Sequence, residues 1–504
     1  MTKLSRVGAL VVLLSLGIAV FQRQAGTPGL QLRLPSWVSS HLPPGLASTL
    51  GVARPAVELF GTPCHCGDLA GLNEPNSCHM SGTVVDCCCS YSAVEQVNRD
   101  DIGPILDKLV QSAFFRYFKV DLYCDCPFWP DDGMCAMRDC SVCECEEDEV
   151  PKIWRAAEGR LASADSPAAA CAAAAQESAL DRTLQPDIRR ALLAVPDWRG
   201  YRNPWMPEAD DAGVEYAYIN LLRNPERFTG YAGEHAARVW QAIYGQPGLE
   251  AGASAAPELR VFYRLISGLH ASISAHLVAE SPLRDDTGEV YAWGPDLAEF
   301  RRRLGSPELR DRVENLYFAY LFVLRAVQKA APLLRGVEYS TGLPEEDAAT
   351  QHFMHKLLDN AALQQVCPIP FDEGRLWRGE EGPVLKEQLR ATFQNITRVM
   401  DCVGCEKCKM WGKLQFLGVA TSLKILFSAE DCSGAPVPEQ GLQLERNEVI
   451  ALVNLLERLS NSVETVRTLS VQLAGGSVAH PQGLGAIQDV VQHGLAPQLR
   501  TGGG

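Results

Sequence analysis

The placement of cysteine constrains the fold of this chain more than any other feature of its sequence. Twelve of the 18 cysteines lie between Cys64 and Cys145, none occurs from 172 to 366, and the last five run from Cys367 to Cys432. A core that used cysteine only as a small apolar residue would not cluster it in this way. We therefore expect these cysteines to form cross-links or to bind metal.

The N-terminus predicts the compartment that the chain enters. Lys3 and Arg6 precede an apolar run from Val7 to Phe21, so residues 1–24 match a secretory signal peptide or a short signal-anchor. The run is shorter than the roughly 20 residues that a membrane-spanning helix needs. Asn395 opens an Asn-Ile-Thr sequon and is the candidate glycosylation site. Together these features predict an oxidising lumen, where disulfides persist.

Composition and charge exclude some classes of protein. The hydrophobic fraction of 46% excludes wholesale disorder. The formal net charge of −15 argues against a nucleic-acid binder, because neutralising phosphates requires clustered Lys and Arg. A chain of 504 residues is expected to form one large or two moderate domains.

Local patterning divides the chain into regions. Residues 25–62 are rich in Pro, Gly and Ser and predict a linker or stem, and residues 63–150 are dense in cysteine and turns. From 213 to 473 the periodicity of apolar residues is helical. The Gly-rich tail over 474–504 is expected to be disordered.

Helical periodicity also predicts individual elements. Short helical patterns include residues 102–117, and longer helices are expected over about 309–334 and 448–473. There is little of the alternation that strands require. The predicted fold class is mainly α, with a disulfide-stapled, loop-rich N-terminal region.

The segment from Cys402 to Cys408 carries the first candidate site. Cys405 and Cys408 form a C-x-x-C pair, and such a pair at the start of a helix suits reversible thiol chemistry because the helix N-terminus stabilises a thiolate. Lys407 and Lys409 would add positive charge. The spacing alone leaves a structural zinc knuckle equally open, and Cys402 offers a third, competing partner.

The second candidate site is the C-x4-C pair formed by Cys135 and Cys140. It lies in a segment rich in Asp, Gly and Met, which is compatible with an exposed, mobile dithiol, although spacing alone favours an ordinary structural disulfide. Neighbouring cysteines rarely bond each other without strain. The cysteines nearer the N-terminus are therefore expected to be static staples with partners elsewhere: Cys64, Cys66, Cys78, Cys87, Cys88 and Cys89.

Several long motifs give the chain a family resemblance. They are Tyr117-Phe-Lys-Val-Asp-Leu-Tyr-Cys-Asp-Cys126-Pro-Phe-Trp129, Arg138-Asp-Cys140, Asn224-Pro-Glu-Arg227-Phe-Thr229-Gly-Tyr231, Ser267-Gly-Leu-His270, Met400-Asp-Cys402-Val-Gly-Cys405-Glu-Lys-Cys408 and Trp411-Gly-Lys-Leu414. Over roughly residues 60–473 the chain resembles the endoplasmic reticulum oxidoreductin family, the flavin-dependent thiol oxidases of the secretory pathway. The extra cysteines Cys124 and Cys143 make it most similar to the plant and algal branch.

The resemblance implies a fold, a cofactor and site residues. It implies one domain over 63–473, in which a helical bundle holds FAD non-covalently. Cys405 and Cys408 match the active-site pair, with Cys408 expected nearest the flavin, and Cys135 and Cys140 match a shuttle pair on a mobile loop. The positions that match flavin contacts are Arg227, Thr229, Trp240, Ser267, His270, Arg303 and Arg312.

The resemblance also suggests roles for other cysteines. It pairs Cys126 with Cys402 near the active site and makes Cys171 a regulatory cysteine, with Cys145 among the regulatory or structural ones. Nested staples are implied for Cys64–Cys89 and Cys66–Cys87. Pairings of Cys78 with Cys88 and of Cys367 with Cys432 stay open.

The implied reaction is a relay of electrons in the endoplasmic reticulum lumen, with membrane attachment through the N-terminus left open. A reduced protein disulfide isomerase reduces the shuttle pair, the shuttle pair reduces the active-site pair, and FAD passes the electrons to O2, giving hydrogen peroxide. No metal and no nucleic-acid partner is implied. Two alternatives remain: a zinc-stabilised scaffold without activity, and a degenerate oxidase that retains FAD without turnover.

Overall fold

The computed structural model describes eleven parts of the chain: residues 91–129, 140–155, 203–207, 216–226, 233–249, 256–304, 307–360, 373, 376–427, 442 and 444–473. The chain divides into two units between Pro63 and Cys64, and every described residue belongs to the second unit. The expectations for residues 1–24, 25–62 and 474–504 lie outside the described residues. So do those for Cys64, Cys66, Cys78, Cys87, Cys88, Cys89, Cys135, Cys171, Arg227, Thr229, Cys367 and Cys432.

Helices make up most of the described chain, so the predicted fold class, mainly α, is confirmed. They are α4 (Tyr91–Val97), α5 (Gly103–Gln111), α6 (Ala113–Arg116), α10 (Gly233–Tyr244), α11 (Pro257–Ala279), α12 (Leu297–Leu304), α13 (Pro307–Lys329), α14 (Ala331–Gly336), α15 (Pro344–Leu358), α17 (Gly382–Val399), α18 (Glu406–Phe427) and α19 (Arg446–Leu473). A π-helical turn, η1 (Asn98–Ile102), follows α4, and a 3-10 turn, η3 (Met400–Cys402), follows α17. None of the helices in the described ranges is long and apolar enough to cross a membrane.

The two longer predicted helices can be compared with the structure. The helix expected over 448–473 is α19, because an unbroken apolar periodicity runs through it. The single helix expected over 309–334 is instead α13 and α14, which meet at Ala330. Pro332 lies in the first turn of α14, where its missing N–H needs no partner, whereas inside a continuous helix it would remove one hydrogen bond.

The described residues also contain two short antiparallel sheets, which the sequence did not predict. β1 (Tyr117–Asp121) pairs with β2 (Tyr216–Asn220), and Val120 lies opposite Ala217. β3 (Ser281–Arg284) pairs with β4 (Val290–Gly294). The helical pattern over 102–117 is the last residue of η1 followed by α5 and α6, which are separated at Ser112. It ends at Arg116, so β1 begins where a helix was expected to finish. Two strands of five residues carry too little alternation to stand out in a sequence.

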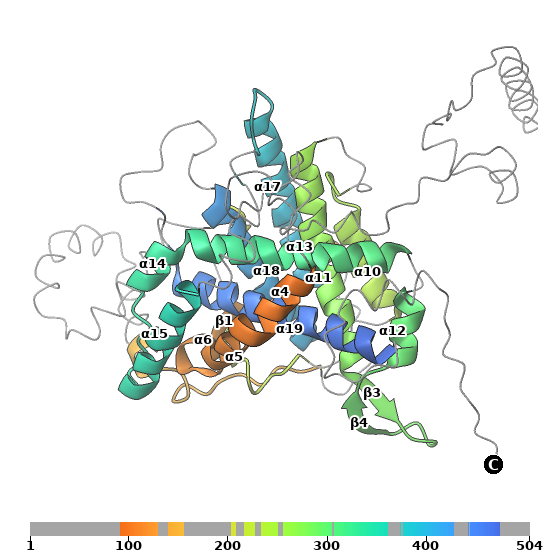
Figure 1. The fold of residues 1–504 in the computed structure, drawn as a ribbon, viewed down its shortest axis with the longest axis horizontal. Helices are drawn as coiled ribbons and strands as arrows, with labels where there is room; N and C mark the ends of the chain where they lie inside the picture. Colours follow the sequence, from red (N-terminus) through yellow and green to blue (C-terminus); the bar gives the residue numbers. More distant parts are fainter. Residues whose placement is uncertain are drawn as a thin grey trace, which may run out of the picture. The chain divides into compact units, whose positions relative to one another are not determined.

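The core of the described part is built from α11, α13, α18 and α19. In Figure 1, α13 (green) runs across α11, and α4 and α5 (orange) lie beside α19 (blue). Two glycines allow these helices to approach closely. A Cβ at Gly268 of α11 would lie 2.4 Å from the carbonyl oxygen of Asn315 in α13, and one at Gly418 of α18 would lie 2.7 Å from that of Ala451 in α19. The close contact of α18 with α19 positions the first turn of α18, which carries the paired cysteines.

A buried ion pair also joins α18 to α19. Lys424 Nζ lies 2.8 Å from Glu448 Oε2, and both side chains are almost fully buried. Asn203 donates a further hydrogen bond to Glu448 Oε1 at 2.8 Å. Buried charges are tolerated only when they are paired and hydrogen-bonded, so this contact fixes how the end of α18 meets the start of α19.

Candidate active site

The paired cysteines lie at the N-terminal end of α18, which is the position at which a C-x-x-C pair suits thiol chemistry. Cys405 immediately precedes the helix and Cys408 lies in its first turn. Their exposed fractions are 2% and 1%, so a bulky partner has little access to them. The backbone N–H of Cys408 donates to Cys405 Sγ at 3.3 Å. A helix N-terminus with a donor on sulfur favours the thiolate that disulfide exchange requires.

The lysines expected to add positive charge beside the pair are partly occupied elsewhere. Lys407 and Lys409 are both buried, and Lys409 Nζ donates to the carbonyl oxygen of Leu122 at 3.1 Å. Lys413, one turn further, forms an ion pair with Asp401 at 2.6 Å. Lys409 and Lys413 therefore also anchor neighbouring backbone and the turn before α18.

Cys402 has a partner other than the C-x-x-C pair. It forms a disulfide with Cys126, with an S–S distance of 2.04 Å. Cys126 follows β1, and Cys402 ends the 3-10 turn η3. The disulfide thus ties the segment after β1 to the turn that leads into the active-site cysteines, which is the pairing that the family resemblance implies.

Cys140 lies against the first turn of α18. It is disulfide-bonded, and its partner lies outside the described residues. Its carbonyl oxygen accepts a hydrogen bond from the backbone N–H of Lys407 at 3.0 Å. Two residues further, the N–H of Val142 donates to Glu406 Oε2 at 2.9 Å. The structure therefore brings one end of the predicted shuttle pair next to the predicted active-site pair, although 264 residues separate Val142 from Glu406 in the sequence.

Asn224 holds the same segment from another side. Its Oδ1 accepts a hydrogen bond from the N–H of Cys143 at 2.7 Å, and its Nδ2 donates to the carbonyl oxygen of Cys143 at 2.8 Å. The carbonyl oxygen of Asn224 accepts from Trp411 Nε1 of α18 at 2.9 Å. Sequence reasoning did not assign Asn224 a role. The signal was its place at the head of the Asn-Pro-Glu-Arg motif, two residues before Glu226.

Glu226 lies just before the predicted flavin contacts Arg227 and Thr229, and sequence reasoning missed it too. Its carboxylate is buried and lies 3.0 Å from Arg458 Nη2 of α19. Burial raises the pKa of Glu226, and the nearby Arg458 opposes that rise. This ion pair ties Glu226, the residue before the predicted contact Arg227, to α19.

Three further thiols lie around this site without a disulfide. They are Cys124, Cys143 and Cys145. Burial, assisted by a hydrogen bond to Asp121, raises the pKa of Cys124 to about 12. Burial and the nearby Glu149 raise the pKa of Cys145 to about 11. Cys143 is exposed, and its Sγ accepts a hydrogen bond from Arg223 Nη2 at 3.1 Å.

Four of the predicted flavin contacts gather where α10, α11 and α13 meet. The rings of Trp240 and His270 stack, with centroids 3.6 Å apart and planes 8° from parallel. Tyr244 Oη lies 3.1 Å from His270 Nδ1, and the guanidinium of Arg312 lies 5.7 Å from the Tyr244 ring. Ser267 is fully buried and accepts a hydrogen bond from Asn315 Nδ2 at 3.0 Å.

Two other predicted positions, Arg303 and Asn395, do not belong to this group of side chains. Arg303 belongs to α12, where the helix is described but this side chain is not. Asn395, the candidate glycosylation site, lies within α17 and is half-buried, so its modification stays a prediction. Among the described residues, no group of three or more His, Cys, Asp or Glu side chains is arranged to hold a metal ion.

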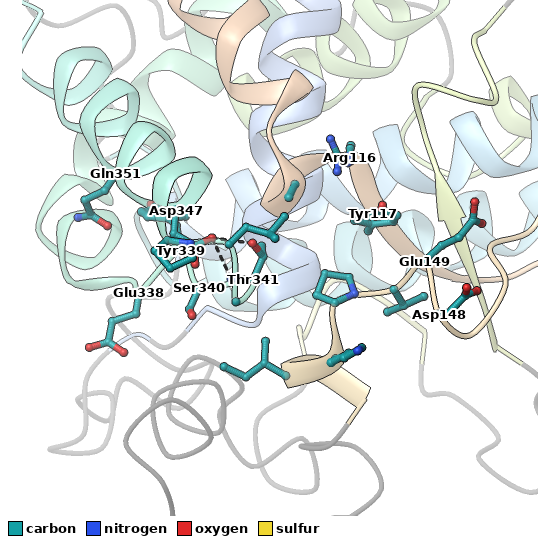
Figure 2. Close-up of a pocket in the computed structure, with 18 residues that line it drawn as sticks. Arg116, Tyr117, Asp148, Glu149, Glu338, Tyr339, Ser340, Thr341, Asp347 and Gln351 are labelled. Carbon is teal, nitrogen blue, oxygen red and sulfur yellow. Dashed lines mark hydrogen bonds between the residues drawn. The ribbon is translucent and has the colours of Figure 1, made fainter.

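A pocket of about 1060 Å³ is a separate feature of this unit (Figure 2). Its walls come from α6, the start of β1, residues 148–153 and the loop between α14 and α15. Asp347 stiffens that loop by accepting hydrogen bonds from the N–H of Thr341 at 3.0 Å and from its hydroxyl at 2.6 Å. None of the predicted site residues lines the pocket.

A mainly helical unit with a C-x-x-C pair at a buried helix N-terminus, and with the disulfide-bonded Cys140 beside that turn, has the features of a thiol oxidoreductase. The family model described as Endoplasmic Reticulum Oxidoreductin 1 (ERO1) matches residues 101–466. The chain therefore belongs to the endoplasmic reticulum oxidoreductin family, and it is a disulfide-forming thiol oxidase of oxidative protein folding.

Two relatives in sequence agree with this assignment. Endoplasmic reticulum oxidoreductin-1 of Arabidopsis thaliana is 46% identical over 410 residues, which cover 79% of this chain and 84% of the relative. ERO1-like protein alpha of Homo sapiens is 36% identical over 423 residues, covering 77% and 90%. A solved mutant of S. cerevisiae Ero1p is 30% identical, covers 76% of this chain and 97% of its own, and has a TM-score of 0.47.

Proposed function

We propose that this enzyme is an endoplasmic reticulum lumenal sulfhydryl oxidase that reoxidises a protein disulfide isomerase through two disulfides in series. The observation that carries the proposal is the hydrogen bond between Lys407 and Cys140, which holds one end of the shuttle pair at the helix turn of the active-site pair. Cys405 and Cys408 are too deeply buried for a folded protein to reach. A second, more accessible pair could react with the partner protein and then pass the electrons to the buried pair.

The first step is exchange with the partner. A thiolate of the reduced isomerase attacks the Cys135–Cys140 disulfide, and a mixed disulfide forms as the original S–S bond breaks. The second thiol of the isomerase then attacks the mixed disulfide. The isomerase leaves oxidised, and Cys135 and Cys140 hold the two electrons as a dithiol.

The second step moves these electrons to the buried pair. A thiolate of the shuttle pair attacks the Cys405–Cys408 disulfide, and the second shuttle thiol completes the exchange, which restores Cys135–Cys140. The N-terminus of α18 stabilises the thiolate released at Cys405 or Cys408. Burial of the pair keeps water and unrelated thiols away from it.

The residues at the meeting of α10, α11 and α13 fit the cofactor that we propose, FAD. Trp240 and His270 offer flat aromatic surfaces that suit a flavin or adenine ring. Arg312, with Arg227 and Arg303 as further candidates, would bind the phosphates, and Thr229 and Ser267 complete the proposed set. When bound, FAD supplies the two-electron acceptor that lies between the Cys405–Cys408 dithiol and O2, with hydrogen peroxide as product.

The remaining cysteine assignments stay proposals. We propose that the Cys126–Cys402 disulfide restrains the active-site turn, since it joins that turn to the end of β1. Cys171 and Cys145 are proposed as regulators, and Cys64–Cys89 and Cys66–Cys87 as staples. Residues 1–24 would direct the chain into the lumen, with cleavage or anchoring as the two outcomes.

The test combines a spectrum with an assay of oxygen uptake. The purified protein should be yellow, with a flavin absorption band, and should consume oxygen when reduced protein disulfide isomerase is added. Cys405→Ser and Cys135→Ser should each slow oxygen uptake by about two orders of magnitude or more, because each removes an obligatory sulfur of the relay. Unimpaired turnover in both variants, or a protein without flavin, would overturn the proposal.

A further inference from the structure

The segment that carries Cys140 is bound to α18 by the side chain of Glu406, which has no role in the two exchange steps described above. Glu406, the first residue of α18, accepts a hydrogen bond from the N–H of Val142 at 2.9 Å. The next residue, Lys407, donates its N–H to the carbonyl oxygen of Cys140 at 3.0 Å. The two groups held in this way are two residues apart, the spacing at which the backbone groups of a strand point to one side. Glu406 and Lys407 therefore form hydrogen bonds along one edge of the segment.

Asn224 forms hydrogen bonds with the next residue of the segment, Cys143. Its side chain, 0% exposed, bonds both the N–H and the carbonyl oxygen of Cys143, at 2.7 and 2.8 Å. Trp411 of α18 donates to the backbone of Asn224 at 2.9 Å. The amide thus acts as a peptide mimic that links the segment back to the active-site helix.

The far end of the segment is attached to β2. The N–H of Cys145 donates to the carbonyl oxygen of Tyr218 at 2.8 Å, and Glu144 forms an isolated antiparallel bridge with Ile219. Residues 140–145 are therefore held at both ends. Among the described contacts of this segment, the hydrogen bond to the Glu406 carboxylate is charge-assisted and is made directly by the active-site turn.

We infer that Glu406 is a positioning residue for the internal step of the relay, with Asn224 supporting it from the other side. The inference rests on the proposed function, since it requires that Cys135–Cys140 and Cys405–Cys408 exchange electrons. In that step one S–S bond of the active-site pair breaks, one S–S bond of the shuttle pair forms, and two electrons with two protons pass to Cys405 and Cys408. The rate depends on how often the reacting sulfurs meet in line, and Glu406 increases that frequency by docking the segment.

The test separates the two exchange steps in the full-length protein. Oxidised enzyme is mixed with reduced protein disulfide isomerase without oxygen, quenched with acid and alkylated, and the reduced fraction of each cysteine pair is measured over time by peptide mass spectrometry. In Glu406→Ala the shuttle pair should be reduced at the wild-type rate. The active-site pair should be reduced about tenfold more slowly, because one charge-assisted hydrogen bond is lost.

Two further variants keep the result decisive. Glu345→Ala is the matched control, because it removes an exposed glutamate from the first turn of another helix, α15. Like Glu406→Ala, it removes a negative charge that interacts favourably with the helix dipole. It should change the reduction rate of neither cysteine pair. Glu406→Gln keeps the size of the side chain and one oxygen acceptor, should fold if Glu406→Ala does not, and should give an intermediate slowing of the internal step. Equal slowing of both pairs, or no slowing of the active-site pair in a folded variant, would overturn the inference.

Cys135→Ser in the same assay distinguishes this inference from the relay itself. If Cys405–Cys408 is still reduced at the wild-type rate in Cys135→Ser, then the relay is wrong. If Cys135→Ser blocks reduction and both Glu406 variants leave it unchanged, then only the role of Glu406 is wrong.

Discussion

Three thiols without a disulfide lie around the proposed active site, yet their surroundings give them different reactivities. Cys124 is half-buried and donates a hydrogen bond to the carboxylate of Asp121, which holds it as a thiol. Cys145 is half-buried near Glu149, whose charge disfavours a thiolate. Cys143 is exposed, and Arg223 donates a hydrogen bond to its sulfur. Accessibility and local charge, rather than position in the sequence, therefore separate these three residues.

This difference predicts an order of alkylation. Because the thiolate is the nucleophile, iodoacetamide at about pH 8 should modify Cys143 first and Cys124 and Cys145 at least about tenfold more slowly. As the pH rises, Cys145, with a pKa of about 11, should become reactive before Cys124, with a pKa of about 12. Peptide mass spectrometry of briefly alkylated, folded protein measures the order. Equal rates for Cys124 and Cys143 would contradict it.

At the scale of elements, the crossing of α18 and α19 positions the active-site turn. Gly418 lets the two helices approach until backbone meets backbone, since a Cβ there would lie 2.7 Å from both Ala451 O and Leu455 Cβ. Lys424 and Glu448 join the same pair of helices near the other end of α18. Any change that separates these helices should therefore move the N-terminus of α18 as well.

Gly418→Ala should accordingly destabilise the protein by about 1–3 kcal/mol, because the added methyl group forces the helices apart. The same substitution at Gly336, at the end of α14, meets no atom within 4 Å and should be almost neutral. Thermal or urea unfolding of both variants measures the difference. A Gly418→Ala protein as stable as Gly336→Ala would show that the helices do not pack as described.

At the scale of the whole unit, the Cys126–Cys402 disulfide joins two segments 276 residues apart in the sequence. One segment follows β1, and the other leads into α18. Lys413 reinforces the same junction, since its ammonium contacts both Asp401 and the carbonyl oxygen of Asp121. The N-terminal and C-terminal parts of the family domain are thus tied together beside the active site.

Removing this tie with Cys126→Ser and Cys402→Ser together should lower the free energy of unfolding by about 2–4 kcal/mol, because the cross-link restricts the unfolded chain. If the disulfide also restrains the active-site turn, then the rate at which the shuttle pair reduces Cys405–Cys408 should differ between the double variant and the wild type. Denaturant unfolding with and without reductant provides the measurement. The wild-type protein should lose stability on reduction, and the double variant should lose less. Equal losses would argue that this disulfide has no part in stability.

Apolar periodicity and cysteine spacing predicted those features of the chain that depend on neighbouring residues alone. The apolar period that runs from Val449 to Val466 places α19 within two residues of its observed start. The C-x-x-C spacing marked Cys405 and Cys408 as a candidate reactive pair, and the structure places the pair at the start of α18. Apolar periodicity does not reveal the break at Ala330, because the apolar pattern continues past Pro332. It does not reveal β1 either, because a strand of five residues is too short to establish an alternating pattern.

Residue patterns alone predicted a mainly helical chain, cysteines that carry its chemistry, and the motifs of a thiol oxidase family. The position of Cys140 on the first turn of α18, and the hydrogen bonds by which Asn224 and Glu406 hold the segment after it, come from tertiary packing. The hydrogen bonds concerned join residues 81 and 264 positions apart. Helical periodicity reports only on neighbours within a few turns, whereas contacts across such distances exist only once α11, α13, α18 and α19 have packed into one core.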